Sequence, residues 1–123
     1  MTKISMDFAF CAAHHLPRST GRCKSTHGHN YKLRVTLAGH PDPATGMIMD
    51  FYELQELVED RVISVLDHSS LNDLLENPTA ELIAAWIWDR LAKDLPRLYE
   101  LGLWEVSDCF VTYRGRTEGP AAS

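Results

Sequence analysis

The sequence predicts an α+β domain in which one face of an antiparallel sheet is covered by two helices. Two stretches near the N-terminus alternate apolar and polar residues with period two, as half-buried strands do. Two longer stretches in the middle of the chain repeat apolar residues at helical spacing, and two short β-type stretches follow them. The resulting order, ββααββ, is typical of a four-stranded antiparallel sheet with both helices on one side.

Composition limits the number of domains and the kinds of partner. The chain has 123 residues, of which 45% are hydrophobic and 24% are charged. These values fit one domain at residues 1–115, followed by a polar tail at residues 116–123 that we expect to be disordered. A net charge of -5 argues against a nucleic-acid partner. The sequence has no apolar run long enough for a membrane span and no signal-peptide pattern, so we expect a cytoplasmic protein without a membrane partner.

The two N-terminal strands predict a cluster of imidazoles. In the first strand, Phe10 and His14 have the same parity, so both side chains point to the buried face if the strand has no bulge. In the second strand, which begins at His27, side chains two residues apart also share a face, so His27 and His29 lie together. Two antiparallel strands joined by the loop at residues 16–26 would bring the three histidines close to one another.

The two helices are predicted from their apolar spacing and their first residues. The first runs from about Tyr52 to Leu66, with Asp50 as its cap, and the second from about Ala80 to Leu95, with Thr79 as its N-cap. The second helix is apolar around much of its circumference, which suggests that it packs on the sheet and also against either another subunit or the first helix. The last two strands are expected at Leu101–Glu105 and Cys109–Tyr113, with a turn near Ser107-Asp108.

Residue types alone leave the chemistry open. The three histidines can hold a metal ion, or they can simply end a strand and line a turn. Cys23 can close a His3Cys metal site, or its thiolate can be a general base beside an open metal. His68, which follows Asp67 at the end of the first helix, can carry protons or only interact with the helix dipole. Cys11 and Cys109 are expected to be small core residues.

Six short stretches together carry a family resemblance. They are Phe10-Cys11-Ala12-Ala13-His14, Cys23 to His29, Gly46 to Phe51, Leu66 to Asn72, Asn77-Pro78-Thr79-Ala80-Glu81 and Tyr113-Arg114-Gly115. In this order and spacing they resemble the 6-pyruvoyltetrahydropterin synthase and 6-carboxytetrahydropterin synthase superfamily, and the resemblance runs from about Phe8 to Gly115. It implies the tunnelling fold and a zinc-dependent lyase that acts on 7,8-dihydroneopterin triphosphate and releases acetaldehyde and triphosphate.

The resemblance also implies roles for individual residues. The zinc ligands would be His14, His27 and His29. Cys23 would be the general base, and Asp67 with His68 would form a proton-transfer pair. In the family these groups meet at subunit interfaces of a homohexamer, which is a dimer of trimers. The three-residue gap between Cys23 and His27 resembles the bacterial queuosine-pathway branch, which makes 6-carboxytetrahydropterin.

For the substrate, the resemblance implies that Glu105 anchors the pterin ring, whereas residue type alone also allows a solvent-facing strand glutamate. The family commonly has Thr after this glutamate and this chain has Val106, so either backbone groups or Thr79 are expected to supply the missing contact. Basic residues are the candidates for binding the triphosphate. They are Lys24, Arg114, Arg18 and Arg22.

Three other functions compete with this hypothesis. The chain can belong to the branch that makes the pyruvoyl product, or it can be a non-catalytic, zinc-containing pterin-binding homologue. The presence of Cys23, Asp67 and His68 argues against the non-catalytic alternative. A zinc hydrolase would need a water-activating carboxylate beside the metal, such as the Glu of a His-Glu-x-x-His segment, and the sequence has no such segment.

Overall fold

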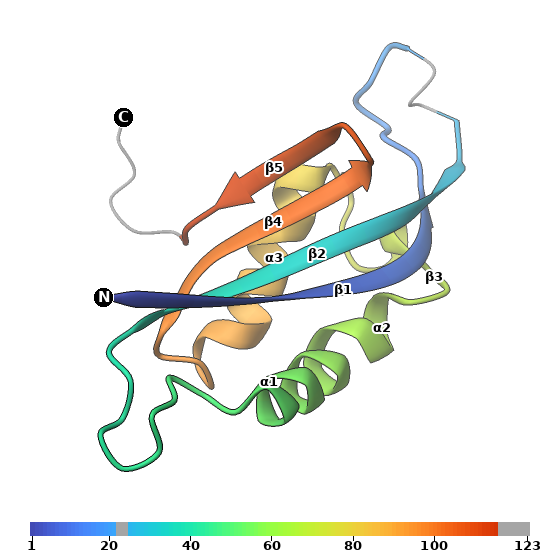
Figure 1. The fold of residues 1–123 in the computed structure, drawn as a ribbon. Helices are drawn as coiled ribbons and strands as arrows, with labels where there is room; N and C mark the ends of the chain where they lie inside the picture. The colour runs from blue at the N-terminus through green and yellow to red at the C-terminus, as the bar shows by residue number, and fades with distance from the viewer. Residues whose placement is uncertain (22–24, 116–123) are drawn as a thin grey trace.

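A twisted sheet forms one layer of the molecule and two helical segments form the other (Figure 1). The computed structural model describes residues 1–21 and 25–115. Cys23 and Lys24, together with the tail predicted at residues 116–123, lie outside the described residues.

The sheet has the strand order β3-β1-β2-β4-β5. Its strands are β1 (Thr2–His14), β2 (His27–Gly39), β3 (Ser69–Ser70), β4 (Leu98–Val106) and β5 (Cys109–Tyr113). The four predicted strands pair in antiparallel fashion, which confirms the predicted fold class. The unpredicted β3 has only two residues and pairs in parallel with the end of β1. Two residues are too few to show a period of two, so the sequence gives no signal for this strand.

The helices begin where the caps were predicted. One helical run comprises α1 (Phe51–Val58), a π-helical turn (Glu59–Ile63) and α2 (Ser64–Leu66). The second helix is α3 (Ala80–Ala92). The carboxylate of Asp50 accepts a hydrogen bond from the Tyr52 N–H, and the hydroxyl of Thr79 accepts one from the Leu82 N–H. Within the described residues, no helix is long and apolar enough to cross a membrane.

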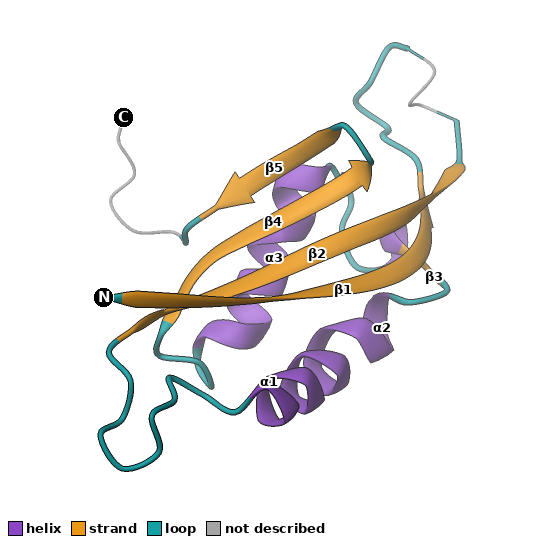
Figure 2. Ribbon diagram, viewed as in Figure 1, coloured by secondary structure: helices purple, strands orange, loops and turns teal. Residues whose placement is uncertain are grey.

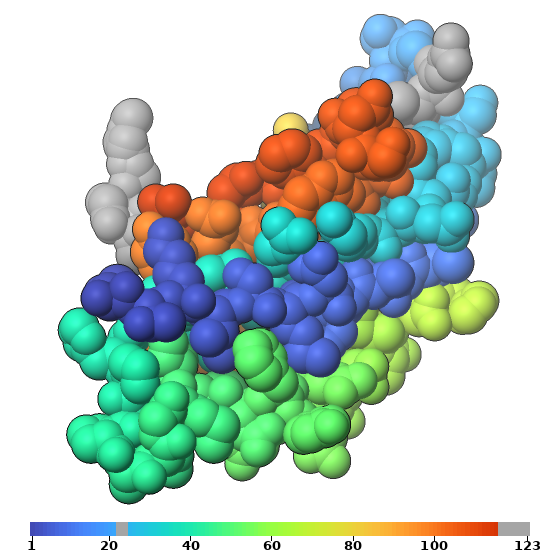
Figure 3. Space-filling model, in the orientation of Figure 1, coloured from blue at the N-terminus to red at the C-terminus, as the bar shows by residue number. Residues whose placement is uncertain are grey.

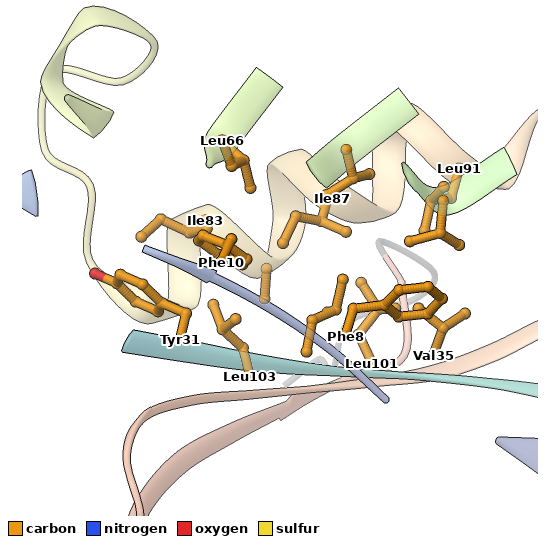
Figure 4. Packing of buried hydrophobic residues seen from close by; sticks show 14 of the residues in the cluster. Phe8, Phe10, Tyr31, Val35, Leu66, Ile83, Ile87, Leu91, Leu101 and Leu103 are labelled. Atoms are coloured by element: carbon orange, nitrogen blue, oxygen red, sulfur yellow. The ribbon is translucent and has the colours of Figure 1, made fainter. Parts of the chain in front are cut away.

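The core lies between the helices and one face of the sheet (Figure 2; Figure 4). From the strands, Phe8, Phe10, Leu33, Leu101 and Leu103 contribute, and none is more than 7% exposed. From the helices, the fully buried contributors include Leu54, Val58, Ile83, Ile87 and Leu91. Burying each of the larger side chains stabilises the folded state by roughly 1.5–3 kcal/mol. A shift of one residue in strand pairing would turn these side chains to the other face, so their burial fixes the register of the strands.

The opposite face of the sheet has no helix over it in the view of Figure 3. A polar and aromatic group lies there. Arg34 donates two hydrogen bonds to Asp7, and Lys32 lies over the ring of Trp104.

The pairing register of β1 and β2 brings the three histidines together. The pairing of β1 with β2 runs without a break from Thr2 opposite Gly39 to His14 opposite His27. His14, His27 and His29 therefore lie at one end of the sheet on its buried side, as the parity of the two strands predicted.

Candidate metal centre and its surroundings

Three imidazoles meet at the end of β1 and the start of β2. The Nε2 atoms of His14 and His27 are 3.1 Å apart. With His29 included, the three side chains offer ligand atoms that all lie within 4.8 Å of one another. The rings meet edge to face, with centroids 4.6–5.1 Å apart. Three nitrogens can thus face one ion, as in a catalytic zinc site with an open position.

His14 is the most firmly held of the three. Its side chain is 1% exposed, and its Nδ1–H donates to the Pro78 carbonyl at 2.9 Å. Burial lowers the pKa of His14 below its ordinary value of 6.5, against the opposing effects of the Pro78 hydrogen bond and the charge of Glu105. The ring is therefore held neutral, which is the form that binds a metal.

The other two histidines also direct Nε2 inward. His27 donates from Nδ1 to the Ser25 carbonyl at 2.7 Å, which leaves its Nε2 free for the cluster. The Nε2 of His29 is buried and has no hydrogen-bond partner among the described residues. A buried nitrogen without a partner is costly, and a metal ion removes that cost. The donor set and this unpartnered atom fit zinc.

Glu105 stands beside the cluster. One carboxylate oxygen is 3.8 Å from Nε2 of His14 and the other is 4.0 Å from Nε2 of His29. The side chain is 27% exposed, so it does not simply face solvent. Glu105 also lines a pocket of about 270 Å³ together with Thr79, Cys109 and Val111. One carboxylate thus faces both the imidazoles and a pocket.

Asp67 and His68 follow α2 and are fixed to the end of β1. Asp67 accepts the Cys11 N–H at 2.9 Å, and the His68 N–H donates to the Cys11 carbonyl. The second carboxylate oxygen of Asp67 is 3.1 Å from Nδ1 of His68. His68 has a φ of 61°, and its side chain is 81% exposed. A left-handed conformation is uncommon for residues other than glycine, and here the two contacts with Cys11 hold it.

His68 lies in a pocket of about 420 Å³ that also includes Cys11, Asn30 and His29. The thiol of Cys11 donates to the Asn30 amide oxygen at 2.8 Å. His68 and one histidine of the cluster thus line the same pocket.

The two basic candidates that the structure describes, Arg114 and Arg18, are each paired with a carboxylate. Arg114 donates to Glu100 at 2.9 Å and stacks over Tyr99, at the end of the β4–β5 pair opposite Glu105. Arg18 is ion-paired with Glu76. Lys24 and Arg22, like Cys23, are outside the described residues.

The prediction that Cys11 and Cys109 are core residues is wrong, because both are exposed. Cys11 has the opposite parity to Phe10 and so points away from the core. Cys109 begins β5 directly after a turn.

Two groups that hold His14 were missed by the sequence analysis. They are the Pro78 carbonyl and Tyr31, whose hydroxyl is 3.3 Å from His14 Nδ1. Burial, aided by the charge of Glu105, raises the pKa of Tyr31, so its hydroxyl stays protonated. Tyr31 has the same strand parity as His27 and His29, and this parity could have predicted that it lies near the cluster. The Pro78 carbonyl is a backbone group in a loop, so no sequence pattern predicts its contact with His14.

The fold and the histidine cluster define an α+β domain with three histidines that could hold a metal ion. The family model described as 6-pyruvoyl tetrahydropterin synthase matches residues 3–116. The chain belongs to this family and is one of its lyases.

Three relatives show how wide the similarity is. The human 6-pyruvoyl tetrahydrobiopterin synthase is 34% identical, over 92% of this chain and 91% of the relative. The 6-carboxy-5,6,7,8-tetrahydropterin synthase of Synechocystis is 38% identical, over 89% and 91%. The dihydroneopterin monophosphate aldolase of Pyrococcus furiosus is 42% identical, over 67% and 72%.

A solved structure agrees in fold. The 6-pyruvoyl tetrahydropterin synthase of Caenorhabditis elegans superposes with a TM-score of 0.86 at 26% identity, covering 94% of this chain and 96% of that one.

Proposed function

We propose that the chain is a zinc-dependent 6-carboxy-5,6,7,8-tetrahydropterin synthase. It converts 7,8-dihydroneopterin triphosphate to 6-carboxytetrahydropterin, releases acetaldehyde and triphosphate, and serves queuosine biosynthesis. The observation that carries the proposal is the convergence of three imidazole nitrogens beside a carboxylate that also lines a pocket.

His14, His27 and His29 are the residues that would hold the zinc ion. Bound zinc supplies a Lewis acid that lowers the pKa of hydroxyl groups on the substrate side chain. The protein holds the His14 ring by its Nδ1–H and favours its neutral form by burial, so Nε2 of this ring is already directed to the place where zinc would bind.

Glu105 and Thr79 form the pterin end of the site. The carboxylate of Glu105 accepts hydrogen bonds from the 2-amino group and the ring N–H of the pterin. The hydroxyl of Thr79 accepts the Leu82 N–H in the substrate-free chain and still has a proton to donate. Val106 offers only apolar contact, so Thr79 is the hydroxyl donor available in this pocket.

Proton transfer falls to Cys23, Asp67 and His68. Cys23 removes a proton beside the ring, and His68 returns protons as the bonds break. Asp67 orients His68 through a carboxylate oxygen that lies 3.1 Å from Nδ1 of the ring. The exposure of His68 supports a site completed across a subunit interface in a hexamer built as a dimer of trimers.

The triphosphate would be bound by Lys24 and Arg114. Arg114 lies at the opposite end of the β4–β5 pair from Glu105, which supports a role in a site that belongs to a neighbouring subunit.

The identity of the reaction product distinguishes the proposed activity from the activities of related enzymes. The protein loaded with zinc is incubated with 7,8-dihydroneopterin triphosphate, and the products are identified by mass spectrometry. We expect 6-carboxytetrahydropterin and acetaldehyde. The 6-pyruvoyl product would assign the chain to the sister branch, and turnover of the monophosphate alone would assign an aldolase activity. Zinc and pterin binding without turnover would indicate a binding homologue.

Replacing Cys23 with Ala separates its two possible roles. We expect turnover to be abolished while the variant keeps its zinc, because the thiolate acts as a base beside an open metal. Zinc is measured by elemental analysis of the purified protein. Loss of zinc from Cys23→Ala would instead indicate a closed His3Cys site.

A further inference from the structure

Tyr31 contacts both the apolar core and the histidine cluster. It lies on β2 two residues after His29, and its side chain is 1% exposed. Its ring stacks on Phe10 with centroids 4.9 Å apart and planes within 9°. Figure 4 shows the ring at one end of the apolar cluster, with its hydroxyl oxygen directed away from the cluster. The stack holds the ring in place, and the hydroxyl projects beyond the core.

The Tyr31 hydroxyl lies beside the histidine cluster, near the nitrogen of His14 that is not directed at His27. It lies 3.3 Å from Nδ1 of His14, and the Tyr31 ring also contacts the His29 ring edge to face at 5.5 Å. A phenylalanine would fill the same space against Phe10. A buried hydroxyl costs desolvation free energy unless it has a partner, so its presence at this position points to a role in hydrogen bonding.

The Pro78 carbonyl decides the direction of these hydrogen bonds. A carbonyl oxygen can only accept, and this one is 2.9 Å from Nδ1 of His14, so that nitrogen carries the proton. The hydroxyl oxygen of Tyr31 is then a second acceptor for the same N–H. The other nitrogen, Nε2, has a free lone pair and lies 3.1 Å from Nε2 of His27.

We propose that Tyr31 is a positioning residue of the metal site. Its hydroxyl, together with the Pro78 carbonyl, fixes the tautomer and the tilt of the His14 ring, so that Nε2 presents its lone pair to the zinc ion. The inference rests on the proposed role of His14 as a zinc ligand. Partners of this kind set both ring orientation and the basicity of the ligand, and losing one typically weakens metal binding.

The test compares Tyr31→Phe with Tyr113→Phe. The first variant keeps the ring that stacks on Phe10 and removes only the hydroxyl. The second removes a hydroxyl from β5, where the Tyr113 ring packs on Trp88 away from the histidines. Zinc affinity is measured by competition with a chromophoric chelator, and the folding of each zinc-free variant is checked by thermal unfolding.

We expect Tyr31→Phe to bind zinc about 10- to 100-fold more weakly than the unmodified protein, with Tyr113→Phe unchanged. Equal zinc affinity in a folded Tyr31→Phe variant would overturn the proposal, as would an equal loss in both variants.

A second measurement needs no variant. The nitrogen chemical shifts and couplings of the histidine rings in the zinc-free protein report which nitrogen carries the proton. We expect His14 to be protonated at Nδ1, and protonation at Nε2 would contradict the proposal.

Neither experiment uses a pterin. A protein that binds zinc as described but does not turn over the substrate would contradict the proposed function and leave the inference about Tyr31 standing. Conversely, an unchanged affinity in Tyr31→Phe would leave the proposed lyase activity standing.

Discussion

Two imidazole sites lie near the end of β1, and they differ in burial. His14 is 1% exposed and donates to a backbone carbonyl, and two further histidines face it. His68 is 81% exposed, and a carboxylate oxygen of its neighbour Asp67 lies 3.1 Å from its Nδ1. The first site is assembled by the fold of a single chain. The second is fixed at its backbone, while its ring is free to contact another molecule. Burial thus separates a histidine cluster that could hold a metal ion from an imidazole whose ring is open to solvent.

The largest effect is expected when the buried site is broken. His14→Ala should lose zinc affinity by more than about 100-fold, because a ligand contributes more than the partners that orient it, and turnover should be lost with the metal. Zinc content and initial rates measure both. His27→Ala should lose zinc to a similar extent with a smaller loss of stability, since His27 is only half-buried.

The matched control is His40→Ala, because His40 is exposed in the loop after β2 and should not affect either quantity. A His14→Ala variant that keeps one equivalent of zinc would contradict the assignment of the metal centre.

The next effect concerns the exposed site. Asp67→Asn keeps an oxygen that can accept the Cys11 N–H but removes the charge that orients His68. We expect turnover to fall by about 100- to 10,000-fold, the usual contribution of general acid/base catalysis, with zinc content unchanged. Steady-state rates measure the fall in turnover, and elemental analysis measures the zinc content. Loss of zinc in this variant would remove the distinction between the two sites.

A smaller effect is expected at the boundary between metal and pocket. Glu105→Gln keeps the shape of the side chain and removes its charge. Substrate binding should weaken by about 1.5–3 kcal/mol, the value of hydrogen bonds to a charged group, and KM should rise accordingly. The variant should keep its zinc. Loss of zinc would show that this carboxylate, which lies 3.8 Å from His14, is a metal ligand.

The smallest effect is expected on the open face of the sheet. The hydrogen bonds from Arg34 hold the pKa of Asp7 below its usual value of 3.8. The folded state therefore gains stability from this group above about pH 3.8, and loses it as the pH falls through the lower folded-state pKa.

Asp7→Asn should accordingly be slightly less stable than the unmodified protein at pH 7, and the two should converge at low pH. Denaturant unfolding at the two pH values measures this difference. Turnover should not change, because Asp7 lies away from both imidazole sites. A difference in stability that grows as the pH falls would contradict this account of the pair.

The histidine cluster was predictable because side chains alternate strictly between the two faces of a strand pair that has no bulge. From Thr2 to His14, β1 pairs with β2 without a bulge, so the face of Phe10 is also the face of His14. The same rule places Cys11 on the opposite face, and the expectation that it is a core residue was wrong because residue type was weighed above parity.

Other features depend on contacts that no local pattern encodes. Asp67 and Cys11 are 56 positions apart, and their hydrogen bond follows only from the packing of α2 beside β1. The π-helical turn at Glu59–Ile63 continues the apolar spacing of the predicted helix, so it leaves no mark in the sequence. The Pro78 carbonyl is a backbone group, and backbone groups carry no residue signature.

We propose that each active site combines the histidine cluster of one chain with the Asp67–His68 pair of another. Co-expression of His14→Ala with Asp67→Asn tests it most directly, since each variant alone should be inactive. Mixed assemblies should contain sites with an intact metal centre from one chain and an intact pair from its neighbour, so a substantial part of the activity should return. If mixed assemblies form and remain as inactive as the separate variants, both groups act within one chain and the account is wrong.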